Sequence, residues 1–315
     1  MTALRIATRG SPLALAQTRL AIDALRAVDP ELETSVVEVS TEGDRDRTTP
    51  LAVLGGRGVF VRAVEDVLLE GRADLAVHSL KDVPGELAPG LVLGAFLPRG
   101  DARDALVASA GRRLAALPPG ARVGTSSQRR VALLRALRPD LAVREIRGNV
   151  DTRLRKVADG EYDGAVLAAA GLERLGRLAE ATQLFEAAEF PPAPGQGVIA
   201  LQCRAGGDPA DRALRALLAR VDDGATRAAA AAERGFLAAL GAGCALPVGA
   251  YARLDGGLLT VRGVIADPAG GAPAFGDATG APAQAEALGR ELAARLLAAR
   301  GATTAGSPAH RERAR

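Results

Sequence analysis

The feature of the sequence that most constrains its fold is an alternation of short apolar runs with longer segments of helical periodicity. The apolar runs have the character of buried strands, which we predict at 4–8, 35–40, 74–78, 122–124, 141–146 and 165–168. Helical patterns lie between them, and we predict helices at 12–27, 59–70, 128–137 and 150–158. Strands that alternate with helices usually form largely parallel sheets, so the sequence predicts an α/β protein.

A weak internal repeat divides the first two thirds of the chain. Residues 6–20 read as a strand, the turn Thr8-Arg9-Gly10-Ser11 and a helix, and residues 123–137 repeat this order around Gly124-Thr125-Ser126-Ser127. In both turns a hydroxyl residue stands where a helix N-cap belongs, and Pro12 occupies a favoured first helical position. The repeat predicts two related α/β domains that face each other across a cleft.

Two segments rich in proline and glycine are predicted to connect these domains. Residues 97–103 would lead out of the first domain, and residues 191–197 would lead back into a strand at 198–202. From about residue 220 the pattern changes to a helix, strand candidates at 248–254 and 257–266, and a helix near 282–300. We therefore expect an α/β domain made of 1–97 and 198–217, a second at 103–191, a smaller α+β C-terminal domain at 220–302 and a flexible tail at 303–315.

Composition argues against several classes of protein. Aromatic residues make up only 3% of the 315 residues and the net charge is only +3, so neither base stacking nor a strong basic surface favours a nucleic-acid partner. Two cysteines are too few for a disulfide framework or a zinc site. The first ten residues lack the apolar core of a signal peptide, and the Ala-rich stretch 225–242 contains charges. We expect a cytoplasmic monomer without metal or membrane contact.

Arginines gather where predicted strands or loops pass into helices, at Arg9, Arg129, Arg130, Arg147 and Arg153. Most single arginines are solvated surface charges. Arg129 and Arg130 differ because they follow Gly-Thr-Ser-Ser, where hydroxyls, a helix N-terminus and two guanidinium groups come together. The pattern predicts a ligand with several carboxylates or phosphates, although no glycine-rich nucleotide loop of the usual spacing accompanies it.

The segment from Val77 to Pro84 lies where a strand ends, which is where open α/β sheets usually bind ligands. Asp82 beside Lys81 could be an ordinary surface ion pair. However, Pro84 constrains the turn, and a carboxylate that faces a cleft lined by arginines is better explained as a partner for a cationic group. His78 could be a packed strand residue or part of the site, and the sequence leaves both readings open.

The two cysteines lie in different surroundings. Cys244 stands in a loop, between Gly243 and Pro247, and a loop cysteine is a candidate nucleophile or covalent attachment point. Cys203 lies in the apolar segment 200–203, where a small hydrophobic role is expected.

Six segments together resemble the porphobilinogen deaminases, in matching order and spacing from residue 4 to about 300: 6–14, 76–84, 124–130, 147–150, 194–197 and 243–244. The resemblance implies three domains, of which the first two are arranged like periplasmic binding proteins. It also implies a dipyrromethane cofactor joined by a thioether to Cys244. The reaction that it implies joins four porphobilinogen molecules head to tail with loss of ammonia, and hydrolysis then releases hydroxymethylbilane.

The resemblance also assigns roles to individual residues. Asp82 matches the catalytic carboxylate, which would stabilise positive charge on the pyrrole rings. The carboxylates of the cofactor would be held by Lys81, Ser127, Arg129, Arg130 and Arg153. The incoming substrate would be bound by Arg9, Ser11, Gln17, Arg147 and Arg174.

The chain departs from the family's pattern at two places. Val53 stands where the family often has lysine, which leaves a lysine role there in doubt, although Arg57 could substitute, and Ala245 replaces a residue that is polar in many relatives. The alternative function is a non-catalytic binding protein of the same two-lobed architecture. Cys244 and Asp82 favour the enzyme, because a pure binder would need neither.

Overall fold

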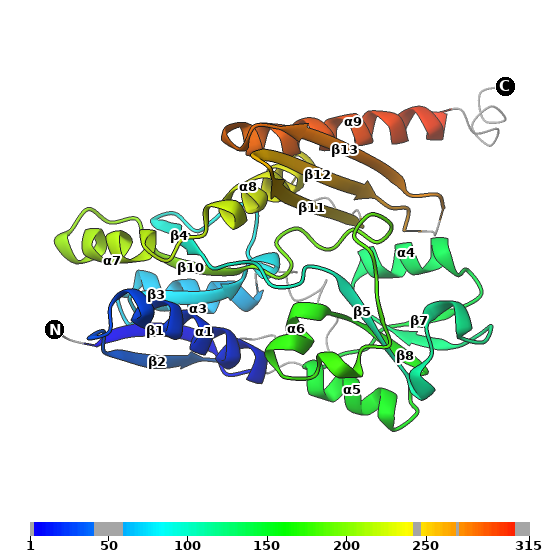
Figure 1. The fold of residues 1–315 in the computed structure, drawn as a ribbon, viewed down its shortest axis with the longest axis horizontal. Helices are drawn as coiled ribbons and strands as arrows, with labels where there is room; N and C mark the ends of the chain where they lie inside the picture. The colour runs from blue at the N-terminus through cyan, green and yellow to red at the C-terminus, as the bar shows by residue number, and fades with distance from the viewer. Residues whose placement is uncertain (1–2, 41–58, 242–246, 269–270, 306–315) are drawn as a thin grey trace.

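The computed structural model describes residues 3–40, 59–241, 247–268 and 271–305, and its strands form three sheets (Figure 1). The first sheet has the strand order β2-β1-β3-β10-β4, and it is built from β1 (Leu4–Arg9), β2 (Thr34–Val39), β3 (Leu75–Ser79), β4 (Leu91–Phe96) and β10 (Ile199–Arg204). β1 pairs in parallel with β2 and β3, whereas β10 runs antiparallel to β3 and β4. The predicted α/β fold is confirmed.

Helices cover both faces of the first sheet. Side chains of α1 (Pro12–Val28) and α7 (Pro209–Ala219) pack on the face that carries Ile6 and Leu75, and those of α3 (Val59–Leu69) pack on the face that carries Ala7 and Ala76. Successive strand residues point to opposite faces, which is why neighbouring residues of β1 and β3 enter different cores. The ends of β1 and β3 are thereby left between α1 and α3.

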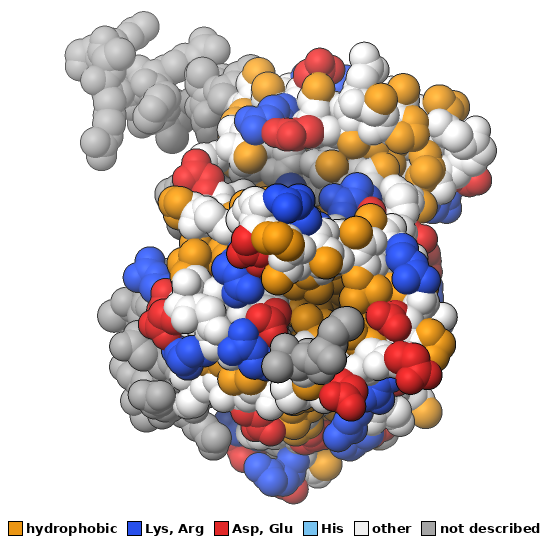
Figure 2. All heavy atoms as spheres, turned by 90° about the vertical axis from the view of Figure 1, so that its left-hand side faces the viewer, with side chains coloured by type: hydrophobic (Ala, Val, Ile, Leu, Met, Phe, Trp, Pro, Cys, Tyr) orange, Lys and Arg blue, Asp and Glu red, His pale blue; other side chains and the backbone are white. Residues whose placement is uncertain are grey.

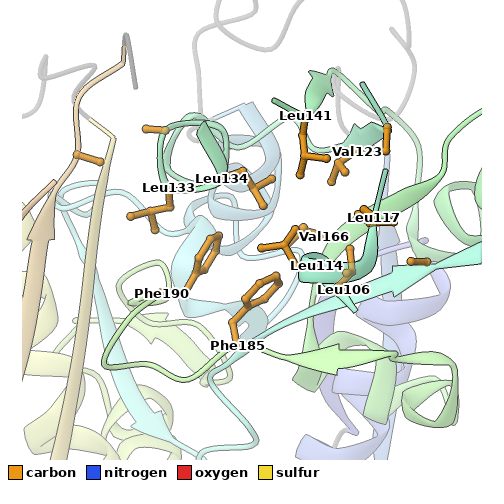
Figure 3. Packing of buried hydrophobic residues seen from close by; sticks show 14 of the residues in the cluster. Leu106, Leu114, Leu117, Val123, Leu133, Leu134, Leu141, Val166, Phe185 and Phe190 are labelled. Atoms are coloured by element: carbon orange, nitrogen blue, oxygen red, sulfur yellow. The ribbon is translucent and has the colours of Figure 1, made fainter. Parts of the chain in front are cut away.

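The second sheet has the order β7-β6-β8-β5-β9, built from β5 (Asp104–Ala108), β6 (Arg122–Gly124), β7 (Ala142–Arg144), β8 (Gly164–Ala168) and β9 (Gln183–Leu184). α4 (Gln128–Leu137) covers one face and α5 (Val150–Ala158) the other, and α6 (Ala169–Arg174) follows β8 directly. Figure 3 shows the core under α4, where the rings of Phe185 and Phe190 stack with centroids 4.5 Å apart.

The two sheets share one topology, as the internal repeat predicts. In each sheet, the strand before the repeated turn, β1 or β6, lies between two strands that pair with it in parallel. The fourth strand in the order of each sheet, β10 or β5, is antiparallel to both of its neighbours. The expectation of largely parallel sheets therefore holds for three strands of each sheet and is wrong for the other two pairings. The fourth strands, β10 and β5, are reversed because each enters its sheet from the segment that connects the two sheets.

The third sheet is antiparallel and consists of β11 (Val248–Asp255), β12 (Leu258–Ile265) and β13 (Ala274–Gly280). α8 (Gly224–Ala239) and α9 (Ala285–Ala305) pack on one face of it through a core around Phe236. On the other face, Val264 and Ala266 join the core of the second sheet. We propose the domain limits predicted above, 1–97 with 198–217, 103–191 and 220–302, because each described strand joins the sheet that they imply.

The two connecting segments lie side by side. The Gly100 amide donates to the carbonyl of Gly197 at 3.1 Å. A buried ion pair between Arg99 and Glu233 (2.6 Å) ties them to α8, and the Glu233 carboxylate also accepts from the amide of Gly195 at 2.6 Å. The segments that join the first two sheets are therefore anchored on α8, one of the two helices that pack on the third sheet.

Charges are mixed on the face shown in Figure 2, where Lys and Arg side chains alternate with Asp and Glu instead of forming one basic patch. None of the helices in the described part of the chain has both the length and the apolar character that a membrane span requires.

Candidate active site

A pocket opens at the ends of β1 and β3, between α1 and α3. Its lining includes Arg9, Ser11, Gln17 and Asp82. α1 begins here because Ser11 caps it, accepting a hydrogen bond from the Ala14 amide at 3.3 Å, with Pro12 in the first turn. The structure thus brings together three of the predicted substrate residues and the predicted catalytic carboxylate.

Two residues that the family match did not assign complete the polar lining, namely His78 and Ser79 at the end of β3. The buried amide of Gln17 donates to the Ser79 hydroxyl at 2.8 Å. His78 is buried and its Nε2 lies 2.8 Å from Oε1 of Gln202. Both readings that the sequence left open for His78 therefore hold, since it is packed in the sheet and also lines the pocket.

Asp82 closes a short 3₁₀ turn, Leu80–Asp82, directly after β3. The turn is anchored by Leu80, which is buried against Gly195, where a Cβ would lie 2.8 Å from Leu80 Cγ. Asp82 itself is half-buried. Within the described residues its carboxylate forms no ion pair with Lys81 or any other cation. A surface ion pair is therefore not what the structure shows.

Lys81 lies in the same turn, close to the arginines of α4. Burial, the largest cause, and the charges of Arg130 and Arg129 lower the pKa of Lys81 to about 8, although Asp82 and Asp104 raise it. Lys81 is therefore a cation that lies between carboxylates and guanidinium groups.

Arg129 and Arg130 are buried at the start of α4, where Ser127 is the N-cap and accepts from the Arg130 amide at 3.5 Å. Their guanidinium groups share one buried carboxylate. Arg129 Nη1 lies 2.7 Å from Oδ2 of Asp104, and Arg130 Nη2 lies 2.6 Å from Oδ1. The arginine charges hold the pKa of Asp104 well below its usual range, against the effect of burial.

Asp104 is the residue of this site that the sequence analysis missed. It is fully buried at the first position of β5 and also accepts from the side-chain amide of Gln196 at 2.9 Å. An aspartate that opens an otherwise apolar run, 104–108, is the signal that could have marked it, because a carboxylate at such a position needs a partner. Asp104 therefore links α4 to the connecting segment that carries Gln196.

Arg147 and Arg153 add two more cations to the same region. Arg153 Nε donates to the carbonyl of Gly148 at 2.8 Å, at the start of α5, where Asn149 is the N-cap. Burial, the largest cause, and the nearby charges of Arg130 and Arg147 together lower the pKa of Arg153 to about 10, although Asp82 raises it. Like charges are thus held close together at the ends of two helices.

This cluster fits a ligand with several carboxylates. Five cations of the described residues lie near one another, namely Lys81, Arg129, Arg130, Arg147 and Arg153. The carboxylates that act on them include Asp82, Asp104 and Glu145, whose Oε1 lies 3.9 Å from Arg147 Nε. Burial, the largest cause, and nearby arginines depress the pKa values of Lys81 and Arg153 in the protein alone, and the carboxylates of a bound polyanion would favour their charged forms. A dipyrromethane with acetate and propionate arms carries the kind of charge that this site lacks.

Arg174 is placed differently. It ends α6, and its Nη2 donates to the carbonyl of Gly197 at 2.5 Å in the connecting segment. Burial lowers its pKa. Arg174 is not among the residues that line the Asp82 pocket.

The remaining sequence predictions concern the cysteines and the 53–60 loop. Cys244 lies outside the described residues, as do Val53, Arg57 and Ala245. Cys203 is buried in the core of the first sheet and burial raises the pKa of its thiol, which confirms its small hydrophobic role. Among the His, Cys, Asp and Glu residues that the structure describes, no group is arranged to bind a metal ion.

Two family models match this chain. Residues 4–212 match the model described as porphobilinogen deaminase, dipyromethane cofactor binding domain. Residues 228–298 match the model described as porphobilinogen deaminase, C-terminal domain.

Curated relatives are similar over nearly the whole chain. The porphobilinogen deaminase of Roseiflexus castenholzii is 50% identical over 298 residues, covering 95% of this chain and 97% of the relative. That of Sorangium cellulosum is 46% identical over 299 residues, covering 94% and 98%. Among solved structures, a putative methionine-binding lipoprotein from Bacillus subtilis is 12% identical with a TM-score of 0.42, covering 69% of this chain and 90% of that one.

Proposed function

The chain belongs to the porphobilinogen deaminase family of transferases, and we propose that the pocket beside Asp82 is where it carries out the family's reaction. In this reaction four porphobilinogen molecules are joined head to tail with loss of ammonia, and hydrolysis releases hydroxymethylbilane. The observation that carries the assignment is the position of Asp82, a carboxylate without an ion pair among the described residues, in a pocket that also presents Arg9. The alternative of a non-catalytic binder loses its basis, because both matching models are of the enzyme.

The first chemical step is favoured by a negative charge beside the pyrrole ring. When the C–N bond of the aminomethyl group breaks, the electron pair leaves with ammonia and a methylene-pyrrole cation remains. A fixed carboxylate stabilises that cation and accepts a hydrogen bond from the pyrrole N–H. Asp82 is suited to this task because its turn is anchored by the buried Leu80 and its carboxylate forms no direct ion pair within the described residues.

The acetate and propionate arms of the substrate bind to positively charged groups and to hydroxyl groups. We assign this binding to Arg9, Ser11 and Gln17, which line the pocket with Asp82. Guanidinium groups bind carboxylates in a bidentate manner, which would orient the ring as well as hold it. Arg147 and Arg174 are assigned to substrate by the family match, and Arg174 would have to exchange its hydrogen bond to the Gly197 carbonyl for one to the substrate if it used Nη2.

The cofactor, when bound, supplies the pyrrole carbon on which the chain grows. We propose that Lys81, Arg129, Arg130 and Arg153 bind its carboxylates, that the hydroxyl of Ser127 assists them, and that Cys244 attaches it through a thioether. The depressed pKa values of Lys81 and Arg153 support this assignment. Asp104 positions both guanidinium groups, because one of its oxygens contacts Arg129 and the other contacts Arg130.

We further propose that the protein works in the cytoplasm, as a monomer, and without nucleic acid as a partner. The mixed charges on the face shown in Figure 2 support the last point. Light scattering of the purified protein measures the oligomeric state, and a dimer would contradict this part of the proposal.

The experiment that tests the function replaces Asp82 by Asn, which keeps the size of the side chain and removes its charge. We expect turnover of porphobilinogen to fall by roughly a hundredfold or more, because a preorganised charge in the transition state is lost. Asp82→Glu keeps the charge in a shifted position and should retain a small residual activity. Glu86→Gln is the matched control, since Glu86 is an exposed carboxylate four residues away.

The measurements are single-turnover formation of enzyme–substrate complexes and the melting temperature of each variant. Near-normal turnover in Asp82→Asn, with the control also normal, would mean that the catalytic carboxylate has been wrongly placed.

A further inference from the structure

A chain of three buried polar side chains runs behind the pocket, from His78 on β3 through Gln202 on β10 to Glu65 on α3. His78 Nε2 lies 2.8 Å from Gln202 Oε1, and Gln202 Nε2 donates to Glu65 Oε1 at 2.7 Å. The register pairs Gln202 with Ala76 and Ala200 with His78, so the two side chains lie on the face of the sheet that α3 covers. All three residues are buried.

The direction of these hydrogen bonds fixes the tautomer of His78. Because the Gln202 amide nitrogen donates to the carboxylate of Glu65, the Gln202 oxygen is the atom that faces His78 and it can only accept. His78 Nε2 must therefore carry the hydrogen, which leaves a lone pair on Nδ1. Burial lowers the pKa of His78 to about 4, outweighing the hydrogen bond to Gln202 and the charge of Asp82, so the ring is neutral at neutral pH.

The Nδ1 atom has no hydrogen-bond partner in the part of the chain that the structure describes. His78 is 6% exposed, and it lines the same pocket as Arg9 and Asp82. A buried imidazole whose tautomer is set by a three-residue chain, and whose other nitrogen has no partner among the described residues, is arranged to accept a hydrogen bond from a ligand.

We propose that His78 Nδ1 accepts a hydrogen bond from the aminomethyl group of porphobilinogen and positions the C–N bond that breaks. The inference rests on the proposed function. The substrate carries carboxylates, which suit Arg9, and a cationic aminomethyl group, which needs acceptors. A neutral imidazole accepts from an ammonium group without repelling it, and without the strong charge attraction that a second carboxylate beside Asp82 would add.

A matched pair of substitutions separates the two nitrogens of the ring. His78→Asn places an amide oxygen near the position of Nδ1 but is too short to reach Gln202. His78→Gln reaches the position of Nε2, and can donate to Gln202, but offers no acceptor at the position of Nδ1. Both variants are studied as cofactor-loaded protein, with loading checked by denaturing mass spectrometry and folding by thermal melting.

If Nδ1 binds the substrate, His78→Gln should raise KM for porphobilinogen roughly tenfold or more, which is the effect of losing a hydrogen bond to a charged group. His78→Asn should stay within about threefold of the wild type. A purely structural role predicts the opposite order, because only the Gln variant keeps the buried chain. Equal losses in both variants, normal kinetics in both, or a greater loss in the Asn variant would overturn the proposal.

A second measurement does not depend on variants of His78. The chain contains two histidines, His78 and His310, so the ¹⁵N spectrum of the histidine rings is simple, and His310→Ala assigns it. We expect Nδ1 of His78 to be unprotonated between pH 6 and 8 and its signal to shift when one equivalent of porphobilinogen is added. A protonated Nδ1, or an unchanged signal while the wild type turns substrate over, would overturn the inference alone. A wild type that consumes no porphobilinogen would instead overturn the proposed function.

Discussion

Replacing Asp104 by Asn should destabilise the protein far more than any surface change, because it leaves two buried guanidinium groups without their carboxylate. Asp104 is fully buried, and its oxygens lie 2.7 Å from Arg129 Nη1 and 2.6 Å from Arg130 Nη2. Removing one partner of a buried ion pair costs on the order of 3–5 kcal/mol. At ~2 °C per kcal/mol, which is typical of large domains, the melting temperature should fall by about 6–10 °C.

The matched control is Asp101→Asn, in the same connecting segment. Asp101 pairs with Arg103 at 2.8 Å, but both side chains are partly exposed, at 23% and 35%. Pairs of this kind contribute about 0–1 kcal/mol, so the control should melt within about 2 °C of the wild type. Differential scanning calorimetry measures both variants in the same buffer.

The pH dependence of the difference in melting temperature between wild type and Asp104→Asn gives an independent check. Asp104 has a pKa well below its usual value in the folded protein, so its stabilising effect is fully present above the unfolded pKa of about 3.9 and is lost as the pH falls through the lower folded value. The gap between wild type and Asp104→Asn should therefore be the same at pH 7 and pH 5 and should narrow only below about pH 4. If the melting temperatures of wild type and Asp104→Asn differ by less than about 2 °C at pH 7, the ion pairs of Asp104 with Arg129 and Arg130 do not stabilise the protein as argued.

Two further predictions concern Lys81 and the connecting segments. Lys81 and Lys156 are the only lysines in the sequence, so the signals of ¹³C-methylated lysines can be assigned with Lys156→Arg. We expect Lys81 to have a pKa of about 8 in the protein without cofactor and a higher pKa after cofactor loading. A pKa near the ordinary value of about 10.4 in both states would contradict this. Since the unfolded chain binds more protons than the folded protein between these two pKa values, stability without cofactor should rise from pH 8 to about pH 10.4. Gly197→Ala should lower the melting temperature more than Gly176→Ala. Both glycines have a positive φ (87° and 68°), but only a Cβ at position 197 would meet the Gly100 carbonyl oxygen, at 2.6 Å. Equal decreases in melting temperature would argue against tight packing of the connecting segments 97–103 and 191–197.

Local features of the fold could be predicted from the sequence, because their causes lie within a few residues. Ser11 and Ser127 were predicted as caps from the residues around them, and both side chains accept from the amide three positions on. The helices at 128–137 and 150–158 have the predicted limits. The internal repeat predicted the shared topology of the two sheets for the same reason, since it rests on two turns of similar chemistry.

Strands that depend on distant partners were missed. β5 begins with Asp104, a residue type that is typical of turns. In the folded protein, Arg129 and Arg130 of α4 balance its charge and allow it to lie in a buried strand. β13 contains glycine, alanine and aspartate, which favour strands weakly, and it is held by pairing with β12. In both cases tertiary contacts outweigh local preference.

The candidate site shows the same division. The position of Asp82 after a strand, and of Arg9 and Ser11 at a helix start, followed from local pattern, and all three line one pocket. The contacts between Asp104 and the α4 arginines, and between His78 and Gln202, join residues 25 or more positions apart. No periodicity in the sequence marks such pairs.

We propose that this chain builds its product on a cofactor attached at Cys244, and the mass of the denatured protein tests this proposal most directly. Wild-type protein should be heavier than the bare chain by two pyrrole units. Cys203→Ala should keep the added mass, because Cys203 is buried in the core of the first sheet. Cys244→Ala should fold and show the bare mass. Added mass that persists in Cys244→Ala, or a wild type with the mass of the bare chain, would contradict the account.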